Sequence, residues 1–130
     1  MDAVCQKTQL MVNCTGPYRL LGEPLVKSCV ENGTDYLDLC GEPEFIEAME
    51  MRYQEAAANS GSIVISACGF DSIPSEIGIN YLRDNFKGKL HAVEGFLSIK
   101  SSKNYCGHAT TWDCAVMGIG ETQTQNAMAL

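Results

Sequence analysis

Three short apolar runs, each closed by glycine and proline, decide the fold of this chain. They are residues 10–17 (LMVNCTGP), residues 36–43 (YLDLCGEP) and residues 63–74 (IVISACGFDSIP). Runs that are rich in Val, Ile and Leu and bounded by Gly and Pro are typical of buried strands rather than helices. The pattern predicts strands over Leu10–Thr15, Tyr36–Cys40 and Ile63–Cys68.

Each predicted strand leads into a segment whose apolar residues have helical spacing. Each segment begins after a proline and closes near a glycine, in the pairs Pro24 and Gly33, Pro43 and Gly61, and Pro74 and Gly88. Proline suits the start of a helix, where its missing N–H has no partner to lose, and glycine suits the end. Strand, glycine turn and helix, three times over, predict consecutive βα units and a parallel sheet, which is an α/β fold.

Beyond Gly88 the pattern changes. Leu90–Ser101 alternates apolar and polar residues, which predicts a longer strand with one exposed face. A polar loop over 101–111 leads to a short predicted helix that carries Trp112, Ala115, Val116 and Ile119. The tail from Glu121 is polar, and we expect it to be frayed. The last third of the chain therefore departs from the βα pattern and fits an antiparallel or partly exposed sheet.

Composition excludes several classes of protein. The 130 residues are 45% hydrophobic and carry a formal net charge of -7, so we expect neither a disordered chain nor a nucleic-acid-binding protein. No apolar run is long enough for a membrane span, and the N-terminus lacks the basic start of a secretory signal. The seven cysteines have no CxxC spacing and lie mostly in apolar stretches, which indicates free thiols in a reducing, intracellular compartment.

The carboxyl ends of parallel strands meet at one edge of the sheet, where ligands bind. The three turns bring a set of candidate site residues to this edge: Thr15, Gly16, Pro17, Tyr18, Gly41, Glu42, Gly69, Phe70, Asp71 and Ser72. Simpler interpretations stay open, because the glycines can be tight turns, Glu42 a helix-dipole charge and Ser72 a helix cap. His108 is the candidate acid–base group, since imidazole titrates near neutral pH.

Familiar catalytic motifs are absent. The sequence contains no GxSxG, P-loop or HExxH, and Gly118-Ile119-Gly120 lacks the third glycine of a dinucleotide fingerprint. The group of Cys106, His108 and Cys114 is too small for a usual zinc site, so no metal is expected.

Three motifs carry a resemblance to a known family. Residues 13–26 (NCTGPYRLLGEPLV), 33–42 (GTDYLDLCGE) and 68–76 (CGFDSIPSE) resemble the saccharopine dehydrogenase-like oxidoreductases, a group that includes trans-acting enoyl reductases of bacterial lipid synthesis. The resemblance extends from about Val12 to Trp112. It implies a Rossmann NAD(P)-binding domain, then an α+β domain for substrate binding and dimer contacts. It also implies hydride transfer in lipid or glycolipid metabolism, in the cytoplasm and at times at lipid droplets or membranes.

The resemblance also implies roles for single residues. Residues 15–18, Gly41, Glu42, Gly69 and Phe70 would border the cofactor, and Asp71 or Ser72 would face a small-molecule or lipid substrate. Residues 1–88 would be the C-terminal half of the Rossmann domain, and 89–130 the truncated start of the substrate and dimerisation domain. The GxGxxG unit of the family has no counterpart in these 130 residues. We therefore expect a fragment that is inactive and binds no cofactor by itself, from an enzyme that is a homodimer at full length.

A second hypothesis belongs to a different class of protein. The edge of the Leu10–Thr15 strand would be open in such a fragment, and an open edge can pair with a strand of another chain. The chain would then be a non-catalytic interaction module.

Overall fold

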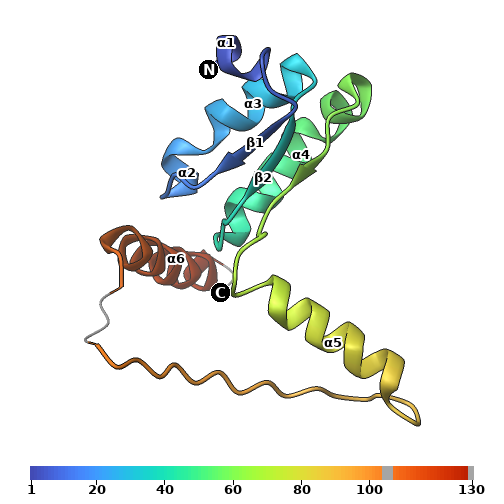
Figure 1. Ribbon diagram of the computed structural model, residues 1–130. Coiled ribbons are helices and arrows are strands. Elements are labelled where there is room, and N and C mark those ends of the chain that lie inside the picture. Colours follow the sequence, from blue (N-terminus) through green and yellow to red (C-terminus); the bar gives the residue numbers. More distant parts are fainter. Residues whose placement is uncertain (104–106, 129–130) are drawn as a thin grey trace.

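The structure is a computed structural model that describes residues 1–103 and 107–128, with side chains described as far as Gly120 (Figure 1). Its elements, in chain order, are α1 (Asp2–Cys5), β1 (Leu10–Asn13), α2 (Tyr18–Leu21), α3 (Glu23–Asn32), β2 (Asp35–Asp38), α4 (Pro43–Ser60), β3 (Val64–Ile65), α5 (Ile73–Asn85) and α6 (Ala109–Met128).

The three strands form one parallel sheet in the order β1-β2-β3, which confirms the predicted α/β fold with a partial Rossmann-like sheet. Val12, Leu37 and Ile65 lie side by side across it. Each strand ends earlier than predicted, because side chains take over the backbone N–H groups that follow. The Asn13 side chain accepts from the Thr15 N–H group at 3.0 Å, and the Asp38 side chain accepts from those of Cys40 and Ala67 at 2.9 Å.

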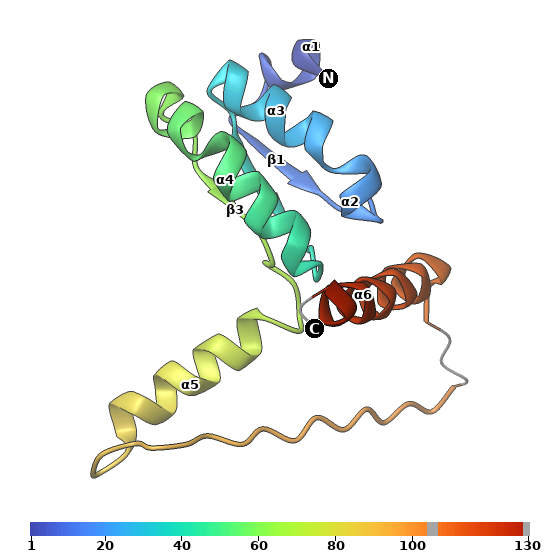
Figure 2. The same cartoon turned by 180° about the vertical axis from the view of Figure 1, so that it is seen from behind.

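Helices α3 and α4 cover one face of the sheet (Figure 2). The core between them is formed by buried side chains of the strands and both helices, namely Val26, Cys29, Val30, Tyr36, Phe45 and Met49. Gly22 permits the close approach at one end of this layer, since a Cβ atom there would lie 2.5 Å from Phe45 Cζ. Gly33 and Gly61 end the two helices with positive φ angles of 67° and 74°, as the sequence pattern predicts.

Within the described residues, no helix covers the opposite face of the sheet (Figure 1). Strand side chains alternate between the two faces, and the residues on this face are all apolar except Asp35. Those that are exposed or half-buried are Leu10, Val12, Leu37, Leu39, Ile63 and Ile65. Parallel sheets usually have both faces covered, so this arrangement leaves an unusual apolar surface.

The strand predicted over Leu90–Ser101 is wrong. Residues 89–100 are extended but form no ladder with any described residue, and a strand exists only where a partner accepts its hydrogen bonds. The predicted helix around Trp112 is present as α6, but it is longer than expected. It runs to Met128, so the frayed tail from Glu121 is also wrong; no proline interrupts residues 109–128. None of the described helices is both long and apolar enough to cross a bilayer.

Candidate functional site

A cavity of about 1020 Å³ lies at the carboxyl ends of the strands, between the βα turns and α6. Both views place α6 beside this edge of the sheet (Figures 1 and 2). The turns after β1 and β2 and the loop after β3 contribute lining residues, which are Cys14, Thr15, Gly16, Tyr18, Leu39, Gly41, Glu42 and Asp71. The segment around α6 contributes His108, Thr110, Thr111, Cys114, Ala115, Gly118 and Ile119.

The turn after β1 is held by a buried hydrogen-bond network. Asn13 is 2% exposed and donates from Nδ2 to the Tyr36 hydroxyl oxygen at 3.0 Å. The Tyr18 hydroxyl donates to the Asn13 carbonyl oxygen at 2.9 Å and accepts from the Leu39 N–H group at 3.3 Å. Burial raises the pKa of Tyr18, so its hydroxyl stays protonated and keeps its role as a donor. The network fixes the first turn against β2.

The carboxylate of Glu42, in the turn after β2, forms hydrogen bonds with α2 and α6. It is 3% exposed. Its Oε1 atom accepts from the Tyr18 N–H group at 2.8 Å and from Cys114 Sγ at 3.2 Å. Its Oε2 atom accepts from the Arg19 N–H group at 3.1 Å and from Arg19 Nε at 2.9 Å. Glu42 thereby caps α2 and anchors α6, and its oxygens face protein donors rather than the open space.

These contacts determine the protonation states of Glu42 and Cys114. Burial alone would raise the pKa of Glu42, but the hydrogen bonds from Arg19 and from the Tyr18 backbone lower it overall. Burial and the contact with Glu42 raise the pKa of the Cys114 thiol to about 11. Glu42 is therefore ionised at neutral pH, and Cys114 is a neutral thiol that donates to it.

A second buried carboxylate, Asp38, supports the loop after β3. It is fully buried, and besides the Ala67 N–H group it accepts from Ser66 Oγ at 3.0 Å. The Cys68 N–H group donates to the Asp38 carbonyl oxygen at 2.7 Å. Ala67 has φ 58°, a left-handed conformation that a side chain rarely adopts. Asp38 thus stabilises a strained loop below the cavity.

Two of the candidate glycines have different surroundings. A Cβ atom on Gly41 would meet nothing within 4 Å, so the backbone of Gly41 is open to the cavity. A Cβ atom on Gly16 would lie 2.9 Å from Thr110 Cγ2, so the space beside Gly16 is already occupied by the start of α6. Gly41 is therefore the position at which a ligand can approach the backbone closely.

The cavity brings together most of the residues that the sequence singles out. Thr15, Gly16, Tyr18, Gly41, Glu42, Asp71 and His108 line it, whereas Pro17, Gly69, Phe70 and Ser72 do not. Phe70 is 68% exposed. Ser72 occupies the position before α5, but its side chain makes no capping hydrogen bond there. Pro17 follows a cis peptide bond and precedes α2.

His108 lies at the start of α6, where its Nδ1 atom accepts from the Thr110 N–H group at 3.3 Å. A neutral imidazole that accepts at Nδ1 carries its proton on Nε2. Cys106 lies outside the described residues. Within the described part of the chain, no three His, Cys, Asp or Glu side chains are placed to hold a metal ion.

Sequence reasoning missed the contribution of α6. Cys114, Ala115 and Ile119 line the cavity, and the apolar spacing of this helix is visible in the sequence. Nothing local indicates that the helix returns to the sheet edge, because its contacts with Gly16 and Glu42 span 70 residues or more.

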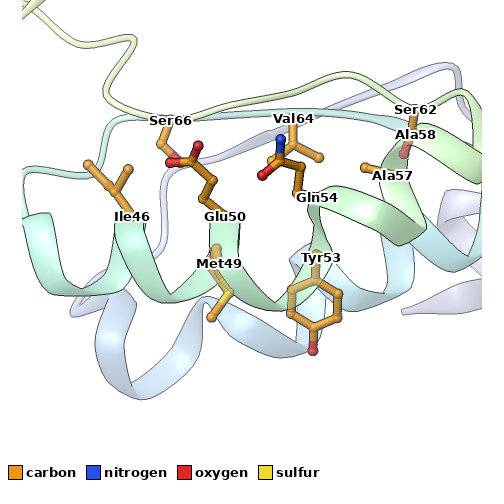
Figure 3. Close-up of a pocket in the computed structure, with 10 residues that line it drawn as sticks. All are labelled: Ile46, Met49, Glu50, Tyr53, Gln54, Ala57, Ala58, Ser62, Val64 and Ser66. Atoms are coloured by element: carbon orange, nitrogen blue, oxygen red, sulfur yellow. The ribbon is translucent and has the colours of Figure 1, made fainter.

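A second cavity, of about 360 Å³, runs along α4 beside β3 (Figure 3). Its walls are mostly apolar, with Ile46, Met49 and Tyr53 on α4 and Val64 on β3. Figure 3 shows the polar ends of Glu50 and Gln54 directed toward the strand side of this groove. The groove lies along the side of β3, whereas the larger cavity lies where the turns after β1 and β2 and the loop after β3 meet, so the larger cavity is the better candidate for a ligand site.

The chemistry of the larger cavity limits its ligand. Its acidic lining residues are Glu42 and Asp71, and no Lys or Arg is among the described residues that line it. A diphosphate needs cationic groups or a free helix N-terminus. Small, apolar and hydroxyl groups, such as those of Gly41, Ala115 and Thr15, instead suit an uncharged ring and a sugar.

Comparisons with known proteins give a consistent result. Residues 1–65 match the family described as the saccharopine dehydrogenase NADP binding domain. A saccharopine dehydrogenase-like oxidoreductase of Rattus norvegicus is 48% identical over 122 residues, which are 93% of this chain and 28% of the relative. The lipid droplet localized protein of Caenorhabditis elegans is 37% identical over 131 residues, which are 100% of this chain and 31% of the relative. No solved structure matches the chain.

A further relative is a Mycobacterium tuberculosis protein named as a candidate trans-acting enoyl reductase. It is 42% identical over 79 residues, which are 61% of this chain and 19% of that protein. The chain thus spans less than a third of the length of these relatives. The match over residues 1–65 contains all three strands of the sheet. The chain therefore belongs to the saccharopine dehydrogenase-like oxidoreductase family, and its parallel sheet lies in the NADP-binding region of that family.

Proposed function

We propose that this chain forms the wall of an NAD(P) site around the nicotinamide ring and its ribose, in an oxidoreductase that transfers hydride to or from its substrate. The observation that carries the proposal is the cavity of about 1020 Å³, which opens at the carboxyl ends of three parallel strands and is lined by six of the candidate residues in the family motifs together with His108. No Lys or Arg is among its described lining residues, which suits the ring and ribose better than the diphosphate.

Each residue has a distinct part in this proposal. The Gly41 backbone faces open space and would lie against the ring or ribose, and Thr15 would offer a hydroxyl to the sugar. Asp71 and His108 line the same cavity and would face substrate, with the Nε2–H group of His108 as a hydrogen-bond donor to it. A bound nicotinamide supplies the hydride chemistry. Glu42 is a positioning residue, because its carboxylate is occupied by protein donors.

A fluorescence titration with NADH and NADPH tests the proposal. One sample is the 130-residue chain. The other is the chain extended at its N-terminus with the segment that precedes the matched region in the rat relative. We expect binding only in the extended chain, because no Lys or Arg lies among the described residues that line the cavity and the GxGxxG unit of the family is absent from these 130 residues. Tight binding by the 130-residue chain would contradict this division of the site, and no binding by either form would contradict the proposed cofactor.

Two valine variants test whether the cofactor binds in the cavity. Gly41→Val places a side chain into the open space, so we expect it to weaken binding by the extended chain at least about tenfold, which is 1.4 kcal/mol. Gly95→Val is the matched control, because a Cβ atom there also meets nothing within 4 Å and Gly95 lies outside the cavity. Equal binding by both variants would show that the cofactor lies elsewhere.

The names of two relatives support a substrate class and a location for this chain. The Caenorhabditis elegans protein is named for lipid droplets, and the Mycobacterium tuberculosis protein is named as a candidate enoyl reductase. These names support a lipid or acyl substrate and a location at lipid droplets for this chain. Incubation of the extended chain with NADPH and an enoyl thioester, followed at 340 nm, tests the substrate class. Separately, microscopy of a fluorescently tagged chain tests whether it lies at lipid droplets.

A second candidate function is that of a non-catalytic interaction module. Within the described residues, β1 pairs only with β2, so its other edge is free for strand addition. This function predicts that neither form of the chain binds NADH or NADPH, while the 130-residue chain binds the purified full-length relative in a pull-down.

A further inference from the structure

Two buried cysteines from different helices lie side by side in the core. Cys5 belongs to α1 and is 1% exposed, and Cys29 belongs to α3 and is 0% exposed. Their Sγ atoms are 3.8 Å apart, although the residues are separated by 24 positions in the chain. A disulfide bond is about 2.05 Å long, so the two sulfur atoms need to approach each other by about 1.8 Å. A small movement therefore brings the pair to bonding distance.

The segment that covers this pair is itself mostly exposed. Cys5 is the one buried residue among positions 1–10, and both views show α1 beside α3 (Figures 1 and 2). Among the contacts that hold the segment, the Asp2 carboxylate accepts from Ser28 Oγ at 2.6 Å, and the Cys5 carbonyl oxygen accepts from Thr34 Oγ1 at 2.8 Å. Few buried contacts resist a local opening of this kind. Movement of one helical turn therefore uncovers Cys5 while α3 stays packed.

The closed structure protects the pair from oxidation. Burial and the contact with Cys5 raise the pKa of the Cys29 thiol to about 12. The thiolate, and not the thiol, attacks a disulfide, so Cys29 is inert at neutral pH while α1 covers it. The Ser28 hydroxyl lies 3.3 Å from Cys5 Sγ and is a polar neighbour of that sulfur. Oxidation therefore requires the opening of α1, after which Cys5 meets solvent first.

We propose that Cys5 and Cys29 form a dithiol site that a small disulfide, such as oxidised glutathione, converts into an intramolecular disulfide. The Cys5 thiolate attacks one sulfur of the oxidant, so that a mixed disulfide forms and one glutathione thiolate leaves. The Cys29 thiolate then attacks the Cys5 sulfur and releases the second glutathione thiolate. Two electrons pass from the cysteine pair to the oxidant, and the two thiol protons go to the two glutathione thiolates.

The folded chain favours the second step of this exchange. When α1 returns to α3, the two sulfur atoms are held 3.8 Å apart, so Cys29 reacts as an intramolecular group with a high effective concentration. The new bond closes residues 5–29 into a loop that contains β1, the turn after it and α2. A cross-link of this kind removes conformational freedom from the unfolded chain and stabilises the folded one. The disulfide would therefore lock the unit that supplies the first wall of the cavity, whether or not the cavity binds NAD(P).

Peptide mapping tests the proposal with the 130-residue chain and an excess of oxidised glutathione. After the free thiols are alkylated in denaturant, cleavage at Lys and Glu separates Cys29 (residues 28–31) from Cys40 (residues 32–42). We expect peptide 1–7 to be linked to peptide 28–31, and dithiothreitol to break this link. The thermal midpoint of the oxidised chain should rise by about 5–10 °C.

Cys40 is the internal control in the same digest. It is 1% exposed and burial raises the pKa of its thiol to about 12, as at Cys29, but its sulfur contacts the backbone of Glu42. We expect Cys40 to be recovered in the alkylated form. A link from Cys5 to Cys40 would show that proximity in the folded chain does not select the pair.

Variants test the order of the two steps and the role of α1. In Cys29→Ser, Cys5 should stop at the mixed disulfide with glutathione, whereas in Cys5→Ser, Cys29 should stay a free thiol because α3 remains packed. Asp2→Ala removes an acceptor that holds α1, so quenched alkylation should show closure at least about threefold faster than in the wild-type chain. Asp84→Ala removes an exposed carboxylate of α5 and should leave the rate unchanged.

The wild-type chain alone can overturn the proposal, even if a variant fails to fold. Cys5 and Cys29 that are both recovered in the alkylated form would do so, as would a Cys5 that keeps its glutathione or links to a different cysteine. These readouts do not depend on NAD(P) binding, so they are independent of the proposed function.

Discussion

The Glu42 carboxylate, in the turn after β2, contacts the start of α2 and also α6, and a single side chain therefore determines much of the site's geometry. Glu42→Gln keeps the size of this side chain but removes its charge and presents an NH2 group to the donors of Tyr18 and Arg19. We expect the free energy of unfolding to fall by about 2–3 kcal/mol in urea denaturation at pH 7. Glu44→Gln is the control: Glu44 lies 3.4 Å from Arg19 Nη2 and is 40% exposed, so the loss should stay below about 1 kcal/mol. Equal losses of unfolding free energy in the two variants would show that Glu42 stabilises the chain no more than the exposed Glu44 does.

The same carboxylate predicts a pH dependence. Burial tends to raise the pKa of Glu42, but the hydrogen bonds from Arg19 and Tyr18 hold it below the ordinary value of 4.5. A lowered pKa contributes stability above pH 4.5, and this contribution is lost as the pH falls through the lower, folded-state pKa. The stability difference between the wild-type chain and Glu42→Gln should therefore be full at pH 6–7 and shrink below pH 4.5. A stability difference between the two chains that grows below pH 4.5 would contradict the lowered pKa of Glu42.

Two glycines should respond in opposite ways to alanine. At Gly22 a Cβ atom would lie 2.5 Å from Phe45 Cζ and 2.8 Å from the Tyr18 carbonyl oxygen, so Gly22→Ala should cost about 1–3 kcal/mol of stability. At Gly41 a Cβ atom meets nothing, and Gly41→Ala should leave thermal unfolding within about 0.5 kcal/mol of the wild-type chain. A tolerant Gly22 would show that α2 and α4 are not in contact at this point.

At the scale of elements, the sequence predicts what is local and fails where a distant partner decides. Proline at the start of α4 and glycine after its end lie within the segment whose limits they mark, so the three βα units can be predicted without a structure. Leu90–Ser101 alternates like a strand, but alternation is only a preference until another strand pairs with it. For the candidate site, the turn glycines indicate the sheet edge, whereas the contact between Cys114 and Glu42 is 72 residues apart and leaves no local signal.

Helix α6 should be the least stable wall of the cavity. It meets the turns through Thr110 beside Gly16 and through Cys114 at Glu42, while Trp112 is 72% exposed and Ile119 is 64% exposed. Helices α3 and α4 contribute buried side chains to the core, with Val26, Cys29 and Val30 in α3 and Phe45 and Met49 in α4. Amide hydrogens of residues 112–120 should therefore exchange at least about tenfold faster than those of α3 and α4 in mass-spectrometric hydrogen exchange. Similar rates would indicate that α6 packs more firmly than its contacts suggest.

At the scale of the whole molecule, charge opposes the association that apolar surface favours. Each chain carries a formal net charge of -7, so two chains repel each other at low ionic strength. The exposed apolar side chains of the sheet, such as Val12 and Ile65, carry no charge, and salt screens the long-range repulsion without weakening apolar packing. Raising NaCl from about 20 mM to 300 mM should therefore increase self-association of the chain in sedimentation equilibrium, because the Debye length falls from about 20 Å to below 10 Å. An association that weakens with salt would indicate ion pairs between the chains, a contact that these apolar side chains cannot make.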